Sequence, residues 1–395
     1  MSQIDVLEIK VVETCNYSCV GCGSFSNLAQ NEEYGLDELR SDLVQISSIV
    51  DKIRELRLYG GEPLLNPELI EYVRVSRECL PNSDIVIITN GTLLHTKDDP
   101  FFKALKKYDA KIFVSYYPLN HDIIDKGVEK ATNNNIPVKK VDIKYFYVKM
   151  RDQVNEGDIT KRFNECHAMC KGAVYLDHGY LYSCPYAPNF RHYDAAFGVK
   201  YANKEDGYNI YCEGANSVDL GHKMRQPLSA CSMCDDELAY VTWKQAPACK
   251  ENWLCSKDNP YIIEGYKWYD YLEEEKAIDF LAIKVDRQNG IILPKVFNTI
   301  DLPKLEMNEF FLWLFDEYSI RYITDLFCIE FDKYGIQIAG LINGELDRCG
   351  VLNQYKKVNV EDIPDNCYII ALYHYYGQRV KVVKDISKQM KLKIK

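Results

Sequence analysis

Three cysteines lie close together near the start of the chain, in the segment CNYSCVGC at residues 15–22. Their C-x3-C-x2-C spacing allows one short loop to place three thiolates around a single inorganic group. A cubane [4Fe–4S] cluster has four irons, so three thiolates leave one iron without a protein ligand. An open coordination position is where a metal site carries out chemistry, whereas a closed site is structural or carries electrons. The spacing therefore favours an open cluster bound by Cys15, Cys19 and Cys22, with a zinc knuckle or unrelated buried thiols as the alternatives.

Two further motifs follow, LYGGEP at residues 58–63 and IITNG at residues 87–91. Gly60 and Gly61 lack side chains, so the backbone can approach a ligand closely at this point. The alternative for the first motif is an ordinary strand-to-helix turn, where glycine and proline are common. The alternative for the second is a simple turn, since Asn-Gly is a frequent turn dipeptide.

Strand and helix patterns alternate through the first part of the chain. This alternation is typical of a parallel α/β sheet or barrel, in which the chemistry is located at the carboxyl ends of the strands. The cluster loop, Gly60–Pro63, Thr89–Gly91 and Ser115 would all lie at that end. The predicted strands are residues 5–12, 55–59, 84–89 and 111–116, and the predicted helices are residues 36–53, 67–79 and 101–108.

Taken together, these motifs resemble those of the radical S-adenosylmethionine (SAM) superfamily over about the first 150 residues. The resemblance implies a partial (β/α)6 barrel whose three cysteines bind the SAM cluster. It also implies that Glu62 belongs to the segment that meets the SAM amino group, and that Ser115 reaches the methionyl or ribose part. The chain departs from the family at Gly21, where members usually carry an aromatic residue that packs near the adenine. The implied cofactor-binding residues are Gly60, Gly61, Glu62, Pro63, Thr89, Asn90 and Ser115.

A second cysteine set lies between residues 166 and 255. Eight thiols in so short a segment of a chain without an apparent secretion signal predict a metal site. The set resembles the twitch auxiliary-cluster module of radical SAM dehydrogenases, which implies a closed [4Fe–4S] cluster that passes or accepts an electron. The alternatives are a pair of structural zinc sites, or a further cluster that uses Cys170, Cys212, Cys249 and Cys255. The implied auxiliary ligands are Cys166, Cys184, Cys231 and Cys234, with Cys170 as the alternative to Cys166.

The last third of the chain has few cysteines and a new pattern of elements. A β-α-β-β-α order indicates a small Rossmann-like α/β module. The segment after its first strand lacks glycine, so we expect a degenerate docking or dimerisation module, with a working nucleotide site as the alternative. We therefore expect three domains, at residues 1–160, 161–258 and 259–395. The predicted elements of the last are helices at residues 306–318, 325–334 and 378–390 and strands at residues 320–324, 336–342 and 367–373.

Composition limits the class of partner and the compartment. The net charge of −10 over 395 residues argues against nucleic acid as the main partner. Fifteen cysteines, a strand-like start at Met1–Lys10 and the lack of a long apolar run predict a soluble cytoplasmic protein that does not enter a membrane. We expect SAM and two [4Fe–4S] clusters as cofactors, and an electron donor such as flavodoxin or ferredoxin.

The residues that follow the second cysteine, in the segment CVGCGSFS at residues 19–26, resemble radical SAM proteins of glycan and capsule pathways. The first hypothesis is therefore hydrogen abstraction from a sugar, nucleotide sugar or related substrate, leading to oxidation, deoxygenation or epimerisation. The second is a peptide-modifying maturase, and the third is a non-catalytic iron–sulfur or zinc scaffold. The sequence identifies neither a catalytic residue nor the hydrogen-atom donor.

Overall fold

A computed structural model describes residues 3–30, 34–164, 166, 173–264, 279–298, 309–314, 337–342, 355–372 and 379–394. The chain divides into two compact units, and each is described by itself. Unit 1 comprises residues 1–164 and 173–266, and unit 2 comprises residues 165–172 and 267–395. Unit 1 thus contains most of the residues predicted for both the barrel and the auxiliary domain.

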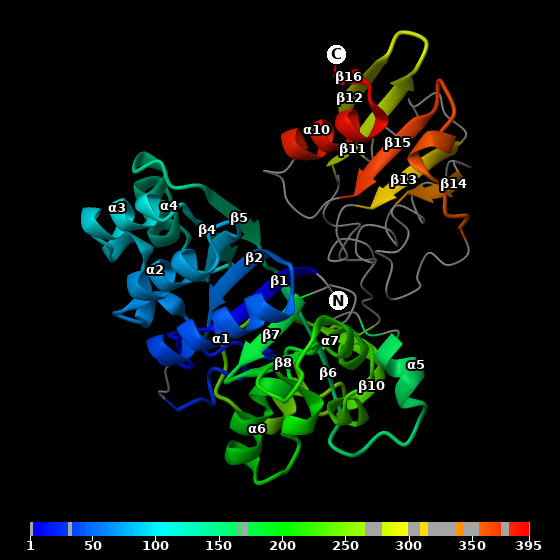
Figure 1. Ribbon diagram of the computed structural model, residues 1–395. Coiled ribbons are helices and arrows are strands. Elements are labelled where there is room, and N and C mark those ends of the chain that lie inside the picture. Colours follow the sequence, from blue (N-terminus) through cyan, green and yellow to red (C-terminus); the bar gives the residue numbers. More distant parts are fainter. Residues whose placement is uncertain are drawn as a thin grey trace. The chain divides into compact units, whose positions relative to one another are not determined.

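Unit 1 is built on an eight-stranded sheet in the order β5-β4-β3-β2-β1-β7-β8-β9 (Figure 1). The strands from β5 to β7 in this order run parallel, and β8 and β9 are antiparallel additions. The predicted parallel α/β core is confirmed. The strands are β1 Gln3–Lys10, β2 Lys52–Tyr59, β3 Asp84–Thr89, β4 Ala110–Tyr116, β5 Val138–Asp142, β7 Ala173–Asp177, β8 Tyr180–Tyr182 and β9 Tyr208–Asn209.

Helices connect the parallel strands and cover one face of the sheet (Figure 1). They are α1 Leu36–Ile49, α2 Leu69–Cys79, α3 Asp99–Lys107 and α4 His121–Asn133. Leu39, Leu43 and Ile46 of α1 pack into the same apolar core as Leu56 and Leu58 of β2. The helix predicted for residues 36–53 ends earlier because Ile53 belongs to β2. None of the helices in the described ranges is both long and apolar enough to cross a membrane.

The opposite face of the parallel strands carries charged side chains. Side chains alternate between the two faces of a strand. Leu7 and Ile9 of β1 point into the apolar core beneath the helices, so Glu8 and Lys10 point to the opposite face. Arg57 of β2 binds Glu8 at 2.9 Å. A buried ion pair of this kind stabilises only while both partners are present. This face, the inner face of the sheet, is therefore polar, and its charged side chains neutralise one another.

The remaining part of unit 1 contains a hairpin and several short elements. His178 and Gly179 join β7 to β8 with φ values of 47° and 76°, as in the primed turns that favour tight hairpins. The other elements include β6 Tyr145–Met150, which pairs with β10 Cys234–Thr242, and the short helices α5 Ile159–Asn164, α6 Phe190–Phe197 and α7 Ser217–Lys223. The 3₁₀ turns are η4 Ala187–Asn189, η5 Lys204–Asp206, η6 Ser229–Met233 and η7 Lys250–Trp253.

Unit 2 contains a mixed six-stranded sheet in the order β14-β13-β15-β11-β12-β16. Strands β13, β14 and β15 are parallel, and β11 pairs antiparallel with β12 and β15. An α/β unit was expected here, but its hairpin β11–β12 was not. The elements are β11 Asp279–Asp286, β12 Ile291–Asn298, β13 Glu309–Leu314, β14 Gln337–Ile342, β15 Tyr368–Leu372, α10 Arg379–Met390 and β16 Lys393–Ile394.

One predicted element of unit 2 is wrong. The helix expected at residues 306–318 is replaced by strand β13, which lies between β14 and β15. Its residues Phe310, Phe311, Leu312 and Trp313 are all less than one-tenth exposed. A continuous apolar run fits a central strand buried on both faces, whereas helical spacing was inferred from the same run. The predicted strands at 336–342 and 367–373 and the helix at 378–390 are confirmed, and the elements predicted at 320–334 lie outside the described residues.

Replacing Trp313 by alanine tests the assignment of β13. The Trp313 side chain is fully buried in the core of unit 2, so Trp313→Ala should lower the free energy of unfolding of this unit by about 3–5 kcal/mol. Hydrogen exchange of the amides in β13 and β15 would measure the loss. The control is Gln337→Ala, at an exposed position of β14; an equal effect of the two changes would contradict the assignment.

Candidate active site

The three N-terminal cysteines lie on a loop that follows β1 at its carboxyl end. A distant segment of the chain holds this loop by main-chain hydrogen bonds. The amide of Val20 donates to the carbonyl of Lys244 at 2.9 Å, and the amide of Ala246 donates to the carbonyl of Ser18 at 3.0 Å. The Ser18 hydroxyl adds a bond of 2.7 Å to the Ala246 carbonyl. The loop that carries Cys15, Cys19 and Cys22 is therefore fixed by residues more than 220 positions away.

The thiols of Cys15 and Cys19 lie in a weakly hydrated environment. Burial raises the pKa of Cys15 to about 12, and the neighbouring Glu62 and Cys22 add to the increase. Burial also raises the pKa of Cys19, to which Cys22 and Cys15 contribute. The sulfurs are thus close enough to influence one another, and thiolates at these positions need a nearby cationic centre. A bound metal would supply that charge, because a coordinating thiol is deprotonated by the metal.

No single-metal site is formed in the part of the chain that the structure describes. No three His, Cys, Asp or Glu side chains there converge on a point where one ion could bind.

Gly60 and Gly61 form the floor of the cluster loop. The amide of Gly61 donates to the carbonyl of Val12 at 2.9 Å, and the amide of Glu62 donates to the carbonyl of Thr14 at 3.0 Å. A Cβ atom on Gly60 would lie 2.2 Å from the Val12 oxygen, and one on Gly61 would lie 2.0 Å from the Thr14 oxygen. These glycines are required because the loop backbone approaches them directly. The backbone at Gly60 and Gly61, which was expected to approach a ligand, instead approaches the segment that leads into the cysteine loop.

Glu62 links the ends of two strands beneath the loop. Its carboxylate is fully buried and accepts hydrogen bonds from the Thr89 hydroxyl at 2.6 Å, the Asn90 amide at 2.8 Å and the Leu64 amide at 3.0 Å. Burial raises the pKa of Glu62, and these donors act in the opposite direction. Pro63 begins the 3₁₀ turn η1 (Pro63–Leu65), which Glu62 caps. The carboxylate therefore sets the position of Asn90.

Asn90 continues this chain of contacts to the cysteines. Its side-chain amide donates to Asn16 Oδ1 at 2.8 Å and lies 3.9 Å from the sulfur of Cys15. Asn16 in turn donates to the Thr92 hydroxyl at 2.8 Å. The end of β3 is thus joined to the first cysteine of the loop, as the motif positions predicted.

Aromatic rings surround the sulfurs on the side of Cys19. Tyr17, Cys19 and Trp243 form one buried cluster, against which Tyr117 and Phe146 pack. The rings of Tyr117 and Trp243 stack with centroids 4.9 Å apart. Burial raises the pKa of Tyr117, whereas a hydrogen bond with Ser115 lowers it. These rings form an aromatic wall beside Cys19. Ser115, on the inner face of β4, contacts this wall through Tyr117.

Gly21 departs from the family pattern for a visible reason. Its φ is +71°, and a Cβ atom would lie 2.8 Å from the side chain of Val148. A larger residue would be strained and would collide with β6. An aromatic side chain cannot occupy this position while the loop keeps its conformation.

Phe25 anchors the far end of the loop. It is fully buried with φ of 50°, in the left-handed region that disfavours a bulky residue. Its ring packs against Tyr186, Phe190, Tyr193 and Trp253 with centroids 5.4–5.8 Å away. This packing offsets the backbone strain and fixes the chain three residues after Cys22.

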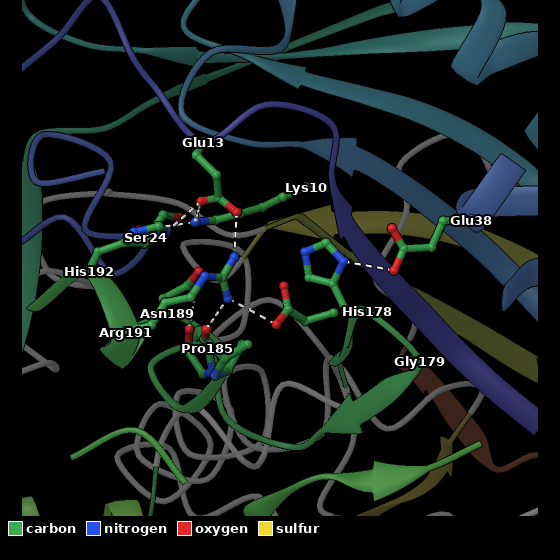
Figure 2. Close-up of polar contacts among 12 residues, drawn as sticks. Lys10, Glu13, Ser24, Glu38, His178, Gly179, Pro185, Asn189, Arg191 and His192 are labelled. Carbon is green, nitrogen blue, oxygen red and sulfur yellow. Dashed lines mark hydrogen bonds and ion pairs between the residues drawn. The ribbon is translucent and has the colours of Figure 1, made fainter. Parts of the chain in front are cut away.

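A buried ion network lies between β1 and the cluster loop (Figure 2). The carboxylate of Glu13 binds Arg191 at 2.7 Å and His192 at 2.9 Å, and it also binds Lys10. Arg191 extends the network to Asp177 at 2.9 Å. Burial raises the pKa of Glu13, but the hydrogen bond with His192 and the charges of Lys10 and Arg191 outweigh it and lower the pKa to about 2. Glu13 is only two residues before Cys15, so this network positions the start of the loop.

Sequence reasoning did not find this network or the two tryptophans. Lys10 and Glu13 lie at and just after the end of β1, and two charged residues at a strand end are only a weak indication of an ion network. Arg191, His192 and Trp243 are separated from the motif by more than 160 residues, and nothing local marks them. His178 stacks on Tyr34 and binds Glu38 at 2.8 Å.

The second cysteine set is spread over several elements. Cys184 follows β8, Cys231 lies in η6 (Ser229–Met233) and Cys234 begins β10. Cys166 belongs to the short segment that is grouped with unit 2, and Cys170 lies outside the described residues. Cys212 and Cys249 are exposed, and the Cys249 thiol donates to Asn252 at 3.0 Å. The proposed auxiliary ligand set stays a prediction.

Comparison with known proteins identifies the N-terminal half of unit 1. Residues 9–143 match the Radical SAM superfamily and carry a domain of that superfamily. The chain is 33% identical over 129 residues to a GTP 3',8-cyclase of Microcystis aeruginosa and 36% identical over 132 residues to one of Nostoc sp.. Each match covers 32% of this chain and 38% of the relative. The chain therefore spans less than half the length of these relatives.

Solved structures are more distant. BtrN in complex with AdoMet and 2-DOIA matches 59% of this chain and 93% of its own length, with 15% identity and a TM-score of 0.35. SuiB of Streptococcus suis bound to S-adenosylmethionine matches 36% of this chain and 41% of its own length, with 16% identity and a TM-score of 0.23.

Replacing Gly61 by alanine tests the floor of the loop. The new Cβ atom would overlap the Thr14 carbonyl, so Gly61→Ala should lower the free energy of unfolding by roughly 1–3 kcal/mol or more and reduce iron incorporation. Thermal unfolding and iron content per chain would be measured. At Gly35 a Cβ atom would meet its nearest neighbour at 3.8 Å, so Gly35→Ala is the matched control. Full iron loading of Gly61→Ala would show that the contact is not needed.

The pKa of Glu13 predicts how stability depends on pH. An acid whose folded pKa is near 2, below its ordinary value of about 4.5, stabilises the fold above pH 4.5 and loses this contribution as the pH falls toward 2. The shift corresponds to about 3 kcal/mol. Glu13→Gln should therefore be destabilising at pH 7, and its difference from the unaltered protein should narrow below pH 4.5. Denaturant unfolding at several pH values would measure this. Glu38→Gln, at a half-exposed ion pair, is the control for the loss of a carboxylate at the surface.

Proposed function

We propose that this chain is a radical SAM enzyme in which Cys15, Cys19 and Cys22 hold a [4Fe–4S] cluster with one open iron, where SAM binds. The observation that carries the proposal is the placement of the three thiols on one loop at the carboxyl ends of β1 to β4, above Gly60 and Gly61. The radical SAM domain over residues 9–143 supports it.

The residues around the loop have separable roles in this proposal. The carboxylate of Glu62 accepts two hydrogen bonds at Oε1 and one at Oε2. Because Glu62 is fully buried, it would orient the Gly-Gly-Glu-Pro segment that meets the SAM amino group through these hydrogen bonds. Asn90 lies beside Cys15 and would contact the bound amino acid part. Ser115 would contact the methionyl or ribose part, and Pro63 and Thr89 would hold Glu62 in place.

When bound, the cluster and SAM would supply a 5′-deoxyadenosyl radical that takes a hydrogen atom from the substrate. The chain's own contribution is orientation and the exclusion of water. Tyr17, Tyr117 and Trp243 close one side of the cysteines, so solvent cannot reach the sulfurs from there. An apolar wall of this kind protects a reactive intermediate from quenching.

The polar inner face of the sheet supports a polar substrate. Glu8, Lys10, Arg57 and Tyr59 supply charged and hydrogen-bonding groups at alternate positions of β1 and β2. Such a face suits a polar small molecule more than a lipid. We propose a sugar-containing substrate, a nucleotide sugar in the first instance, which the enzyme would oxidise, deoxygenate or epimerise. The name of the relatives, GTP 3',8-cyclase, favours a guanine nucleotide as the second candidate.

A second [4Fe–4S] cluster is part of the proposal. Cys166, or Cys170 in its place, would bind it together with Cys184, Cys231 and Cys234 and close its coordination. In an oxidation this cluster would accept the second electron. A flavodoxin or ferredoxin would reduce the first cluster, and unit 2 would serve as a docking or dimerisation module.

Release of 5′-deoxyadenosine tests the function and the substrate class together. The full chain, reconstituted anaerobically with iron and sulfide, should cleave SAM under dithionite, and Cys15→Ala should lose at least 100-fold of this activity. Nucleotide sugars, GTP and short peptides would then be compared as additives. Stimulation by nucleotide sugars supports the first candidate and stimulation by GTP alone supports the second.

Two results would count against the proposal. Stimulation only by peptides would replace the substrate class. Intact SAM in every reaction, with zinc instead of iron in the protein, would remove the enzyme assignment itself and favour a metal scaffold.

A further inference from the structure

We propose that Trp243 raises the reduction potential of the cluster held by Cys15, Cys19 and Cys22 through a hydrogen bond to one of its thiolates. The inference rests on the proposed function, because it concerns the cluster assigned there. It assigns a tuning role to a residue far from the motif, in the segment that follows β10.

The contact is direct, and neighbouring groups hold the indole ring in place. The indole N–H of Trp243 donates to the sulfur of Cys19 at 3.2 Å, and both residues are only 7% exposed. The main-chain amide of Trp243 is fixed to the carbonyl of Lys144 at 2.8 Å. The ring is held between Tyr117, with centroids 4.9 Å apart, and Tyr17, with centroids 5.7 Å apart. Backbone and ring together aim the N–H at the sulfur.

The expected effect follows from the charge of the cluster. Reduction adds an electron, so the reduced cluster and its thiolates are more negative than the oxidised one. A donor to a thiolate sulfur stabilises the more negative state, and hydrogen bonds to cluster sulfurs are one of the means by which proteins set the potential. The contribution is larger in a dry environment, where electrostatic interactions are less screened. The aromatic wall around Cys19 provides this environment.

The chain also supplies a matched control. The indole N–H of Trp253 donates to the main-chain carbonyl of Cys22 at 2.8 Å, not to a sulfur. Trp253 is fully buried and packs against Phe25 and Tyr193 with centroids 5.5 Å and 5.8 Å away. Both tryptophans thus support the cysteine loop through one N–H each, but of the two it is Trp243 that contacts a cysteine sulfur. Losing the Trp253 bond removes a loop contact and leaves the charge at sulfur unchanged.

A potentiometric titration followed by electron paramagnetic resonance (EPR) of the reduced N-terminal cluster tests the inference. The full chain, Trp243→Phe and Trp253→Phe would be reconstituted and their iron content compared. The signal of the N-terminal cluster is identified as the one absent in Cys15→Ala. Trp243→Phe should have a more negative midpoint potential at equal iron content, and Trp253→Phe should match the unaltered protein.

A second variant keeps the inference testable if Trp243→Phe fails to bind the cluster. Placing 3-benzothienylalanine at position 243 keeps the ring size and removes the N–H, and it should show the same negative shift. An unchanged potential in both variants at position 243, or equal shifts in Trp243→Phe and Trp253→Phe, would overturn the inference and leave the proposed function intact. If the unaltered protein gives no signal that depends on Cys15, the proposed function fails first.

Discussion

The contact between two pieces of backbone determines the rest of the site. Residues 12–15 leave β1 and run directly over Gly60 and Gly61 at the end of β2, at distances that leave no room for a Cβ atom. Two main-chain hydrogen bonds join these segments, so the start of the cysteine loop extends the pairing of β1 with β2 beyond the ends of both strands. The first thiol is thereby placed relative to Glu62, Asn90 and the other strand ends.

Buried charge is the second constraint. Glu13 lies below the loop with Lys10, Arg191 and His192 around its carboxylate. Such a network adds little net stability in comparison with apolar packing, but loss of one member leaves the others unpaired and costs several kcal/mol. It therefore requires α6 and the loop to keep one relative position. Phe25 and its aromatic neighbours impose the same requirement from the other end of the loop.

Much of the first 150 residues could be predicted because its signals are local. The alternation of strands and helices, the cysteine spacing and the Gly60-Gly61-Glu62-Pro63 turn each occupy a few adjacent residues. The contacts of Trp243, Arg191 and His192 could not be predicted, because they join segments that only the folded chain brings together. The segment around Phe310–Trp313 was misassigned because a fully apolar run is compatible with a buried helix and with a central strand. Its position between the parallel strands β14 and β15 shows that it is a central strand.

The central claim is that one iron of the N-terminal cluster has no protein ligand. EPR spectra of the reduced cluster with and without SAM test it most directly, in a chain whose Cys231 and Cys234 are replaced by alanine to remove the signal of a second cluster. The account predicts that SAM shifts the spectrum, and that Cys19→Ala in the same background removes the signal. A spectrum that SAM leaves unchanged would contradict an open iron at Cys15, Cys19 and Cys22.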